Sequence, residues 1–218
     1  MVQTYAIGDI HGCLVKLQRL VKRCQRDAAH QPTTFVFLGD YIDRGPDSRG
    51  VVEYLINLQS QQSDRIVCLA GNHEELALAA LHAGEYENWL RNGGDETLRS
   101  YGIGSVADLP PHHIAWLKTL RDQHDDGRRL FVHAGINPRR PLDQQDRHDL
   151  RWIREPFLSD DRDYGRLIVH GHTPLQTDLP DQRPNRLNLD TGAVYGGPLT
   201  AAAFTDKETA PLKYLRAF

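Results

Sequence analysis

The sequence predicts an α/β protein with a parallel sheet, because a strand, a loop and a helix follow one another three times from the N-terminus. Short apolar runs with the composition of buried strands stand at residues 5–7, 35–38 and 66–70. Each run leads into a glycine, and apolar residues then recur at helical spacing over 14–24, 46–58 and 74–82. Parallel strands joined by helical crossovers account for this alternation.

The remainder of the chain changes character twice. Residues 84–125 are typical of helices interrupted by glycine, and we expect them to form a small helical cap beside the sheet. Further strands are predicted at 130–132, 167–169, 186–189, 199–204 and 212–215. The polar segment 137–164 predicts surface loops with one short helix at about 150–157. No repeat or linker is evident, so we expect one domain over residues 1–218.

Composition excludes several classes of function. The chain has 26 basic and 29 acidic residues, a balance that gives no electrostatic reason to expect nucleic acid or a membrane as partner. No apolar run reaches spanning length, and the first residues lack a signal-peptide pattern. The three cysteines follow no metal-ligand spacing, and Cys24 and Cys68 are predicted to be buried, reduced thiols. A cytoplasmic location is the default expectation.

Five predicted strand ends carry an oxygen or nitrogen ligand close to a glycine. These are GDIHG (8–12), GDYIDRG (39–45), GNHE (71–74), HAG (133–135) and GHT (171–173). Glycine lets the backbone turn sharply and approach a ligand, and open α/β sheets bind ligands at the carboxyl ends of their strands. A single Gly-Asp turn is more often only a turn, but five in one chain indicate a shared metal site. Asp40 is the candidate to bridge two metals.

The ligand types narrow the choice of metal. Carboxylate, amide oxygen and imidazole without thiolate suit Mn, Fe or Zn, whereas Mg alone would be expected to use fewer histidines. Two adjacent metals can share a hydroxide and stabilise in-line attack on phosphorus. We therefore expect two divalent metal ions, with Mn preferred and Fe or Zn as alternatives.

In the order and spacing of these five motifs the chain resembles the calcineurin-like metallophosphoesterases. Within them it is most similar to the phosphoprotein phosphatase group, with its bacterial and phage-type serine/threonine protein phosphatases. The resemblance extends over residues 8–173. It implies two packed mixed β-sheets flanked by helices, with a dinuclear metal centre at the strand ends.

The resemblance also implies a role for each motif residue. Two sets of side chains would hold the metals: Asp9, His11 and Asp40 the first, and Asp40, Asn72, His133 and His172 the second. His73 would be the general acid that protonates the leaving alcohol, oriented and kept charged by Asp43. Phosphate oxygens would be bound by Arg44, by Asn72 and by a second arginine, Arg154 in preference to Arg151, because some family members carry a similar Trp-x-Arg-Glu string.

Other motif-like residues have ordinary explanations. His170, two residues before His172, is expected to play a structural part rather than to bind a metal directly. Glu74 is expected to favour the N-terminus of the following helix. Residues 92–95 form either a loop near the substrate or a helix-ending turn, and residues 190–194 would shape the floor of the site. The histidines in polar contexts, expected to be solvated, are His112, His113, His124 and His148.

The implied function is a metal-dependent phosphomonoesterase, most similar to serine/threonine protein phosphatases, in which a metal-held hydroxide attacks phosphorus directly. A symmetrical diadenosine tetraphosphate hydrolase is the alternative, because residues 190–200 would also fit that group. Those hydrolases usually depart from GDIHG at the histidine and from GDYIDRG at the Asp-Arg pair, whereas His11 and Asp43 are present here. A broad phosphatase of small phosphoesters lies between the two. An inactive module that binds a phosphorylated partner is disfavoured, because no ligand or acid is missing. The oligomeric state is left open.

Overall fold

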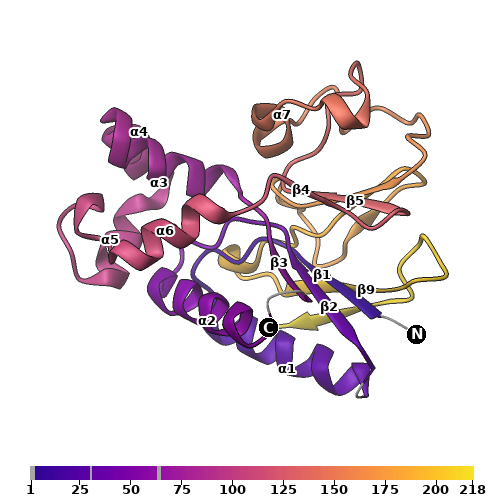
Figure 1. Ribbon diagram of the computed structural model, residues 1–218, viewed down its shortest axis with the longest axis horizontal. Coiled ribbons are helices and arrows are strands. Elements are labelled where there is room, and N and C mark those ends of the chain that lie inside the picture. The colour runs from indigo at the N-terminus through magenta and orange to yellow at the C-terminus, as the bar shows by residue number, and fades with distance from the viewer. Residues whose placement is uncertain (1–2, 30, 63–64) are drawn as a thin grey trace.

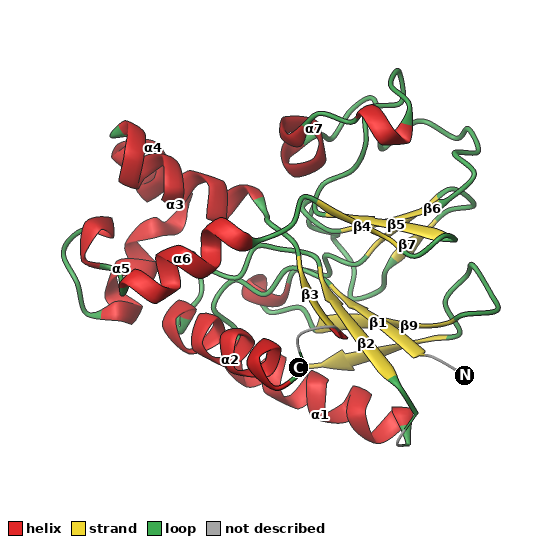
Figure 2. Cartoon of the chain, in the orientation of Figure 1, coloured by secondary structure: helices red, strands yellow, loops and turns green. Residues whose placement is uncertain are grey.

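The computed structural model describes residues 3–29, 31–62 and 65–218, in which ten strands form two mixed sheets (Figures 1 and 2). The strands are β1 (Gln3–Ile7), β2 (Thr33–Phe37), β3 (Ile66–Cys68), β4 (Gln123–Asp125), β5 (Arg129–Val132), β6 (Leu167–His170), β7 (Asp181–Gln182), β8 (Arg186–Asn188), β9 (Leu199–Thr205) and β10 (Lys213–Ala217). The sheet orders are β10-β9-β1-β2-β3 and β4-β5-β6-β8-β7. In each sheet three neighbouring strands are parallel, β1-β2-β3 in one and β5-β6-β8 in the other.

Helices flank the two sheets. They are α1 (Leu14–Ala28), α2 (Ser48–Gln61), α3 (Asn72–Ala83), α4 (Tyr86–Trp89), α5 (Asp95–Tyr101), α6 (Pro111–Thr119) and α7 (Arg147–Trp152). Figure 1 shows α1 and α2 beneath the first sheet, and α7 beyond the second sheet. The predicted fold class, two packed mixed sheets flanked by helices, is therefore confirmed.

The alternation of side chains along β1 explains the layers. Tyr5 and Ile7 belong to the apolar cluster that the first sheet shares with α1 and α2, whereas Ala6 belongs to a second cluster with Phe131 and Leu187 of the other sheet. Because successive strand residues point to opposite faces, one strand serves both layers. Both faces of the first sheet are thus buried, which agrees with its nearly continuous apolar sequence.

The helical cap (residues 86–119) lies beside the first sheet, next to α3 (Figure 1). Its helices α4 and α5 are joined by a π-helical turn, Leu90–Gly94, in which Gly93 has a φ of 98°. The carbonyl of Gly93 accepts a hydrogen bond from the backbone N–H of Arg44, at 3.1 Å. The turn predicted at 92–95 therefore packs against the loop that follows β2.

Several predicted boundaries were wrong. The helix expected from Glu74 begins at Asn72, because the Glu74 carboxylate accepts the N–H of Gly71 at 2.9 Å and so caps that earlier turn. The short helix expected at 150–157 is α7, which the Asp146 side chain caps through the N–H of His148 at 2.9 Å. The strands β4 and β7 were not predicted, since they are short and polar.

One of the histidines expected to be solvated is buried. His113 is only 1% exposed, and its Nδ1 lies 2.8 Å from the hydroxyl of Tyr101. His112 and His148 are exposed, as predicted, whereas His124 is half-buried against Phe131. The two adjacent histidines of α6 therefore differ because only one of them faces the core.

The cysteines follow the prediction. All three are free thiols, with Cys24 and Cys68 buried and Cys13 half-buried. Among the described helices, none has both the length and the apolar character needed to cross a membrane.

A close approach between the two sheets at Gly8, which follows β1, generates a prediction about stability. A Cβ at Gly8 would overlap the carbonyl oxygen of Leu189, which follows β8. We expect Gly8→Ala to lower the free energy of unfolding by about 1–3 kcal/mol. At roughly 2–4 °C per kcal/mol, differential scanning calorimetry should detect the fall in Tm. Gly104→Ala is the matched control, since a Cβ there meets no atom within 4 Å. Equal Tm values for the two variants would contradict this interpretation.

Candidate active site

The carboxyl ends of the parallel strands in both sheets meet at one place. From the first sheet, the chain after β1 brings Asp9 and His11, and the chain after β2 brings Asp40. From the second sheet, the residues after β5 and β6 bring His133 and His172. All five side chains are buried. The site is therefore composite, and neither sheet alone contains it.

Asp40 lies between two groups of ligand atoms. Its Oδ2 is 3.4 Å from Nε2 of His11, and its Oδ1 is 3.4 Å from Nε2 of His133. One possible ligand atom from each of His11, Asp40 and His73 lies within 4.8 Å of the others, and the same holds for Asp40, His133 and His172. The Asp40 carboxylate is thus shared, with one oxygen facing each group.

Asn72 adds an amide oxygen to the second group. Its Oδ1 is 2.9 Å from Nε2 of His133 and 2.8 Å from Nδ1 of His172. Asp9 lies in neither group. Its two carboxylate oxygens accept the backbone N–H of His172 at 3.2 and 3.0 Å, so this side chain joins the loop after β1 to the loop after β6.

The backbone at the site is held in an unfavourable conformation. Among the described residues, six that are not glycine have φ between 43° and 71°: His11, Ala29, Asp40, Asp43, Arg44 and His172. All but Ala29, which ends α1, were predicted site residues. Such conformations cost about 1–3 kcal/mol each and persist only where the surroundings enforce them. This strain supports the site independently of the sequence motifs.

Glu74 helps to enforce that conformation. Its Oε2 accepts the N–H of Asp40 at 3.0 Å as well as that of Gly71, and its Oε1 accepts the N–H of Tyr41 at 2.7 Å. The predicted position at a helix N-terminus is correct. The contact with the loop after β2 is an additional role that the sequence did not reveal.

His73 and Asp43 form a buried pair beside the shared carboxylate. Nδ1 of His73 lies 2.8 Å from Oδ2 of Asp43, and the Asp43 carboxylate also accepts from Trp89 and Thr97 of the cap. Nε2 of His73 has no hydrogen-bond partner in the described parts of the chain and lies 4.0 Å from Asp40. Burial by itself would lower the pKa of His73, but the charges of Asp40 and Asp43 outweigh burial and raise it.

The pKa values of the other imidazoles and of the Asp40 carboxylate are all lowered. Burial lowers the pKa of His11 to about 3 and that of His172 to about 2, and it also lowers the pKa of His133. For Asp40 burial acts to raise the pKa, yet the surrounding histidines, His133 foremost, hold it below its usual range. Neutral imidazole and ionised carboxylate are the forms that bind metal ions.

The candidate arginines differ in their surroundings. Nη1 of Arg44 lies 2.9 Å from Nε2 of His11, so its guanidinium contacts the first group of ligands. Arg151 is buried, and it binds Asp122 at 2.6 Å and Glu75 at 2.9 Å. Arg154 is exposed and close enough to His172 for its charge to act on the pKa of that ring.

Two further residues from the motif-like segments, Asp190 and His170, are buried. Asp190 is buried, which raises its pKa to about 7. The pKa of Asp9 is raised first by its own burial and then by the charge of Asp190. His170 is fully buried, with its ring centroid 5.1 Å from that of Phe157.

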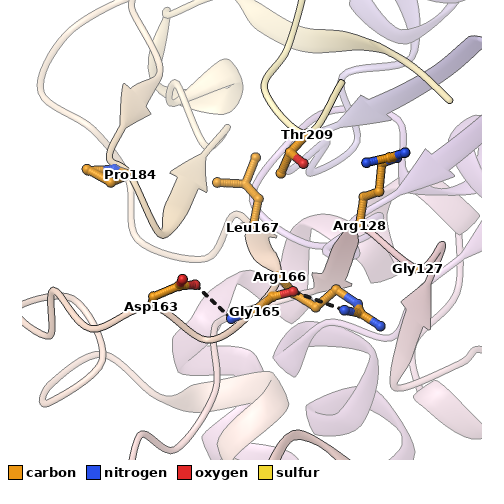
Figure 3. Close-up of a pocket in the computed structure, with 8 residues that line it drawn as sticks. All are labelled: Gly127, Arg128, Asp163, Gly165, Arg166, Leu167, Pro184 and Thr209. Atoms are coloured by element: carbon orange, nitrogen blue, oxygen red, sulfur yellow. Dashed lines mark hydrogen bonds between the residues drawn. The ribbon is translucent and has the colours of Figure 1, made fainter. Parts of the chain in front are cut away.

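A pocket of about 310 Å³ lies at the other end of the second sheet (Figure 3). Its lining includes Arg128, which precedes β5, and Gly165 and Arg166, which precede β6. His133 and His172 follow these same strands at their carboxyl ends. The pocket of Figure 3 is therefore separate from the candidate active site.

Known proteins resemble the chain along most of its length. It is 31% identical over 207 residues to a serine/threonine-protein phosphatase 1 of Salmonella typhimurium, covering 91% of this chain and 90% of the relative. It is 30% identical to a symmetrical bis(5'-nucleosyl)-tetraphosphatase of Pseudomonas syringae, covering 86% of this chain and 60% of the relative. A protein serine/threonine phosphatase structure from Saccharomyces cerevisiae has the same fold, with a TM-score of 0.66 at 15% identity over 100% of this chain and 80% of the other.

The family model for calcineurin-like phosphoesterases matches residues 3–207. The matched residues include all of the strand ends that form the site, and the two-sheet fold agrees with the match. The chain belongs to the calcineurin-like phosphoesterase family, and it is a metallophosphoesterase.

Proposed function

We propose that this metallophosphoesterase is a phosphomonoesterase that acts as a serine/threonine protein phosphatase. The observation that carries the proposal is the shared Asp40 carboxylate, which lies between two groups of ligand atoms with the His73–Asp43 pair beside it. Two adjacent divalent cations and a proton donor can together promote hydrolysis of a phosphate ester. The similarity to a serine/threonine-protein phosphatase over 91% of the chain supports this substrate class.

The residues present suit two divalent metal ions. Asp9, His11 and Asp40 would hold the first, and Asp40, Asn72, His133 and His172 the second. The fit is supported by the donor types and by the approach of Asn72 Oδ1 to Nε2 of His133 at 2.9 Å and to Nδ1 of His172 at 2.8 Å, which brings three possible ligand atoms together. We propose manganese, with iron or zinc accepted by the same donors. When bound, the metals would neutralise phosphoryl oxygens and lower the pKa of water.

The protein groups around the metals would position the substrate. Arg44 and Arg154 would bind phosphoryl oxygens, because Arg151 is already bound by Asp122 and Glu75. The amide nitrogen of Asn72 would add a further donor to the phosphoryl group. Nε2 of His73 would give its proton to the leaving oxygen as the bond from that oxygen to phosphorus breaks.

A dinucleoside tetraphosphate hydrolase is the second candidate. A pocket of about 480 Å³, lined by residues 174–178 and by Thr191 and Tyr195 among others, adjoins the loops that carry His172 and Asp190. Tyr195 is 63% exposed, so it is available to stack on a base. The intact His11 and Asp43 favour the protein phosphatase.

We also propose a cytoplasmic location, which the unpaired cysteines support.

The shared carboxylate generates a prediction about metal content. We expect Asp40→Asn to lower bound manganese from about two ions per chain to less than one, because the neutral amide is a weaker ligand on both sides. Plasma mass spectrometry after equilibrium dialysis measures the stoichiometry, and the rise of Tm with added metal should diminish in parallel. Asp206→Asn, an exposed position, is the control. Unchanged metal content in Asp40→Asn would rule out the bridging role.

His73 is close enough to Asp40 to be a ligand instead of an acid, and one variant separates these roles. We expect His73→Asn to lower kcat on a phosphoserine peptide by roughly 10²–10⁴, the usual contribution of a general acid. Its metal content should stay near that of the unmodified protein, since Asp9 and His11 remain. If metal and activity are lost together, His73 is a ligand and the acid must be sought elsewhere.

A paired turnover assay on manganese-loaded protein tests the substrate class. We expect kcat/KM to be higher for a phosphoserine or phosphothreonine peptide than for diadenosine tetraphosphate. A preference for the dinucleotide, with ADP as product, would instead establish the second candidate. Absence of turnover with both, and with p-nitrophenyl phosphate, would identify a binding module.

A further inference from the structure

The carboxylate of Asp43 is held by two residues of the helical cap as well as by His73. Nε1 of Trp89 lies 3.1 Å from Oδ1 and 3.0 Å from Oδ2, and the hydroxyl of Thr97 donates to Oδ1 at 2.7 Å. His73 binds Oδ2 at 2.8 Å. Trp89 and Asp43 are fully buried and Thr97 is 1% exposed, so water does not replace these donors.

Thr97 fixes the backbone of Asp43 as well as its side chain. Its Oγ1 also accepts the N–H of Asp43 at 2.9 Å, and Oγ of Ser48 accepts the same N–H at 3.1 Å. Asp43 has a φ of 71° in an irregular loop, so no helix or strand determines where its side chain points. The hydroxyl of Thr97 therefore bonds both the backbone N–H and the side-chain carboxylate of Asp43, the residue that binds His73.

The cap is built so that the indole of Trp89 reaches Asp43. Trp89 ends α4, directly before the π-helical turn, and a Cβ added at Gly94 would come within 2.9 Å of three atoms of the indole ring. Gly94 thus leaves the space that the ring fills. The Tyr86 ring packs edge-on against the same indole at 6.0 Å between centroids.

We propose that Trp89 and Thr97 are positioning residues for proton donation by His73, acting through Asp43; this inference rests on the proposed function, in which His73 is the general acid. They fix the rotamer of the Asp43 carboxylate, and the carboxylate fixes the imidazole ring through Nδ1. Nε2 then points toward the oxygen that leaves phosphorus. Without these donors the carboxylate rotates, and the imidazole no longer has one orientation.

Loss of the correct orientation of His73 should affect the hydrolysis of two esters differently, according to whether the leaving group needs a proton. When the bond between phosphorus and the serine oxygen breaks, the oxygen leaves as an alcohol only if it receives the proton from Nε2 of His73, while the new bond to phosphorus comes from the oxygen of water. A p-nitrophenolate anion is stable and leaves without a proton. Misplacement of the acid therefore slows the serine ester more than the nitrophenyl ester.

The test compares kcat for a phosphoserine peptide and for p-nitrophenyl phosphate in manganese-loaded variants. We expect Trp89→Phe and Thr97→Ala to lower kcat on the peptide by about tenfold, the effect of one lost hydrogen bond to a charged group, with much smaller losses on p-nitrophenyl phosphate. Thr97→Ser should restore the peptide rate. Trp116→Phe is the matched control, because it removes an indole N–H that donates to Gln59 at 2.6 Å, away from Asp43. KM, metal content and Tm are measured alongside.

The possible results distinguish a failure of the positioning role from a failure of the proposed acid role of His73. Should His73→Asn be selective for the serine ester while Trp89→Phe and Thr97→Ala slow both esters equally, the positioning role is overturned and the acid stands. Equal losses on both esters in His73→Asn would overturn the acid role itself. In the double variant His73→Asn with Trp89→Phe, we expect the second change to have no further effect on the peptide rate, because both act through one proton. Additive losses would contradict the proposal.

Discussion

The structure depends on one buried negative charge, the carboxylate of Asp40. A carboxylate removed from water is strongly unfavourable unless it is paired, and here His11 and His133 face its two oxygens at 3.4 Å. One of its oxygens also accepts the N–H of His73, at 3.1 Å. To bring these partners together the chain adopts a left-handed backbone conformation at several residues. The carboxylate of Glu74 accepts the backbone N–H of Asp40 and so holds the loop that follows β2. The convergence of two sheets is what supplies ligands from opposite sides.

The cap is connected to this charge through a second carboxylate. Asp43 follows Asp40 on the same loop, so a contact that fixes Asp43 also restrains the segment that carries the shared ligand. Ser48 at the start of α2 and Thr97 on α5 both accept its backbone N–H. Helices that lie outside the two sheets thereby contribute to the precision of the site.

The sequence predicted the fold class and nearly all of the clustered side chains, because each stands within two residues of a glycine at the end of an apolar run. Gly39–Asp40 and Gly171–His172 are local signals of this kind. The contacts of Trp89 and Thr97 were not predictable, since both residues have the spacing of ordinary helical positions and their partner is some 46–54 residues away. His113 was misjudged for the same reason, because its partner Tyr101 is on another helix. Local sequence identifies what stands at a strand end, but packing decides what holds it there.

Because the ligands come from two sheets, the geometry of the site depends on the distance between those sheets. Between the sheets stand Ala6 and Ala202, which are small, alongside larger residues such as Val36 and Leu187. The separation of the two layers sets how far His133 and His172 lie from Asp40. The apolar filling between the sheets therefore acts as a spacer for the active site, so that evolution or design cannot enlarge this layer of the core without also altering the distance between the ligands.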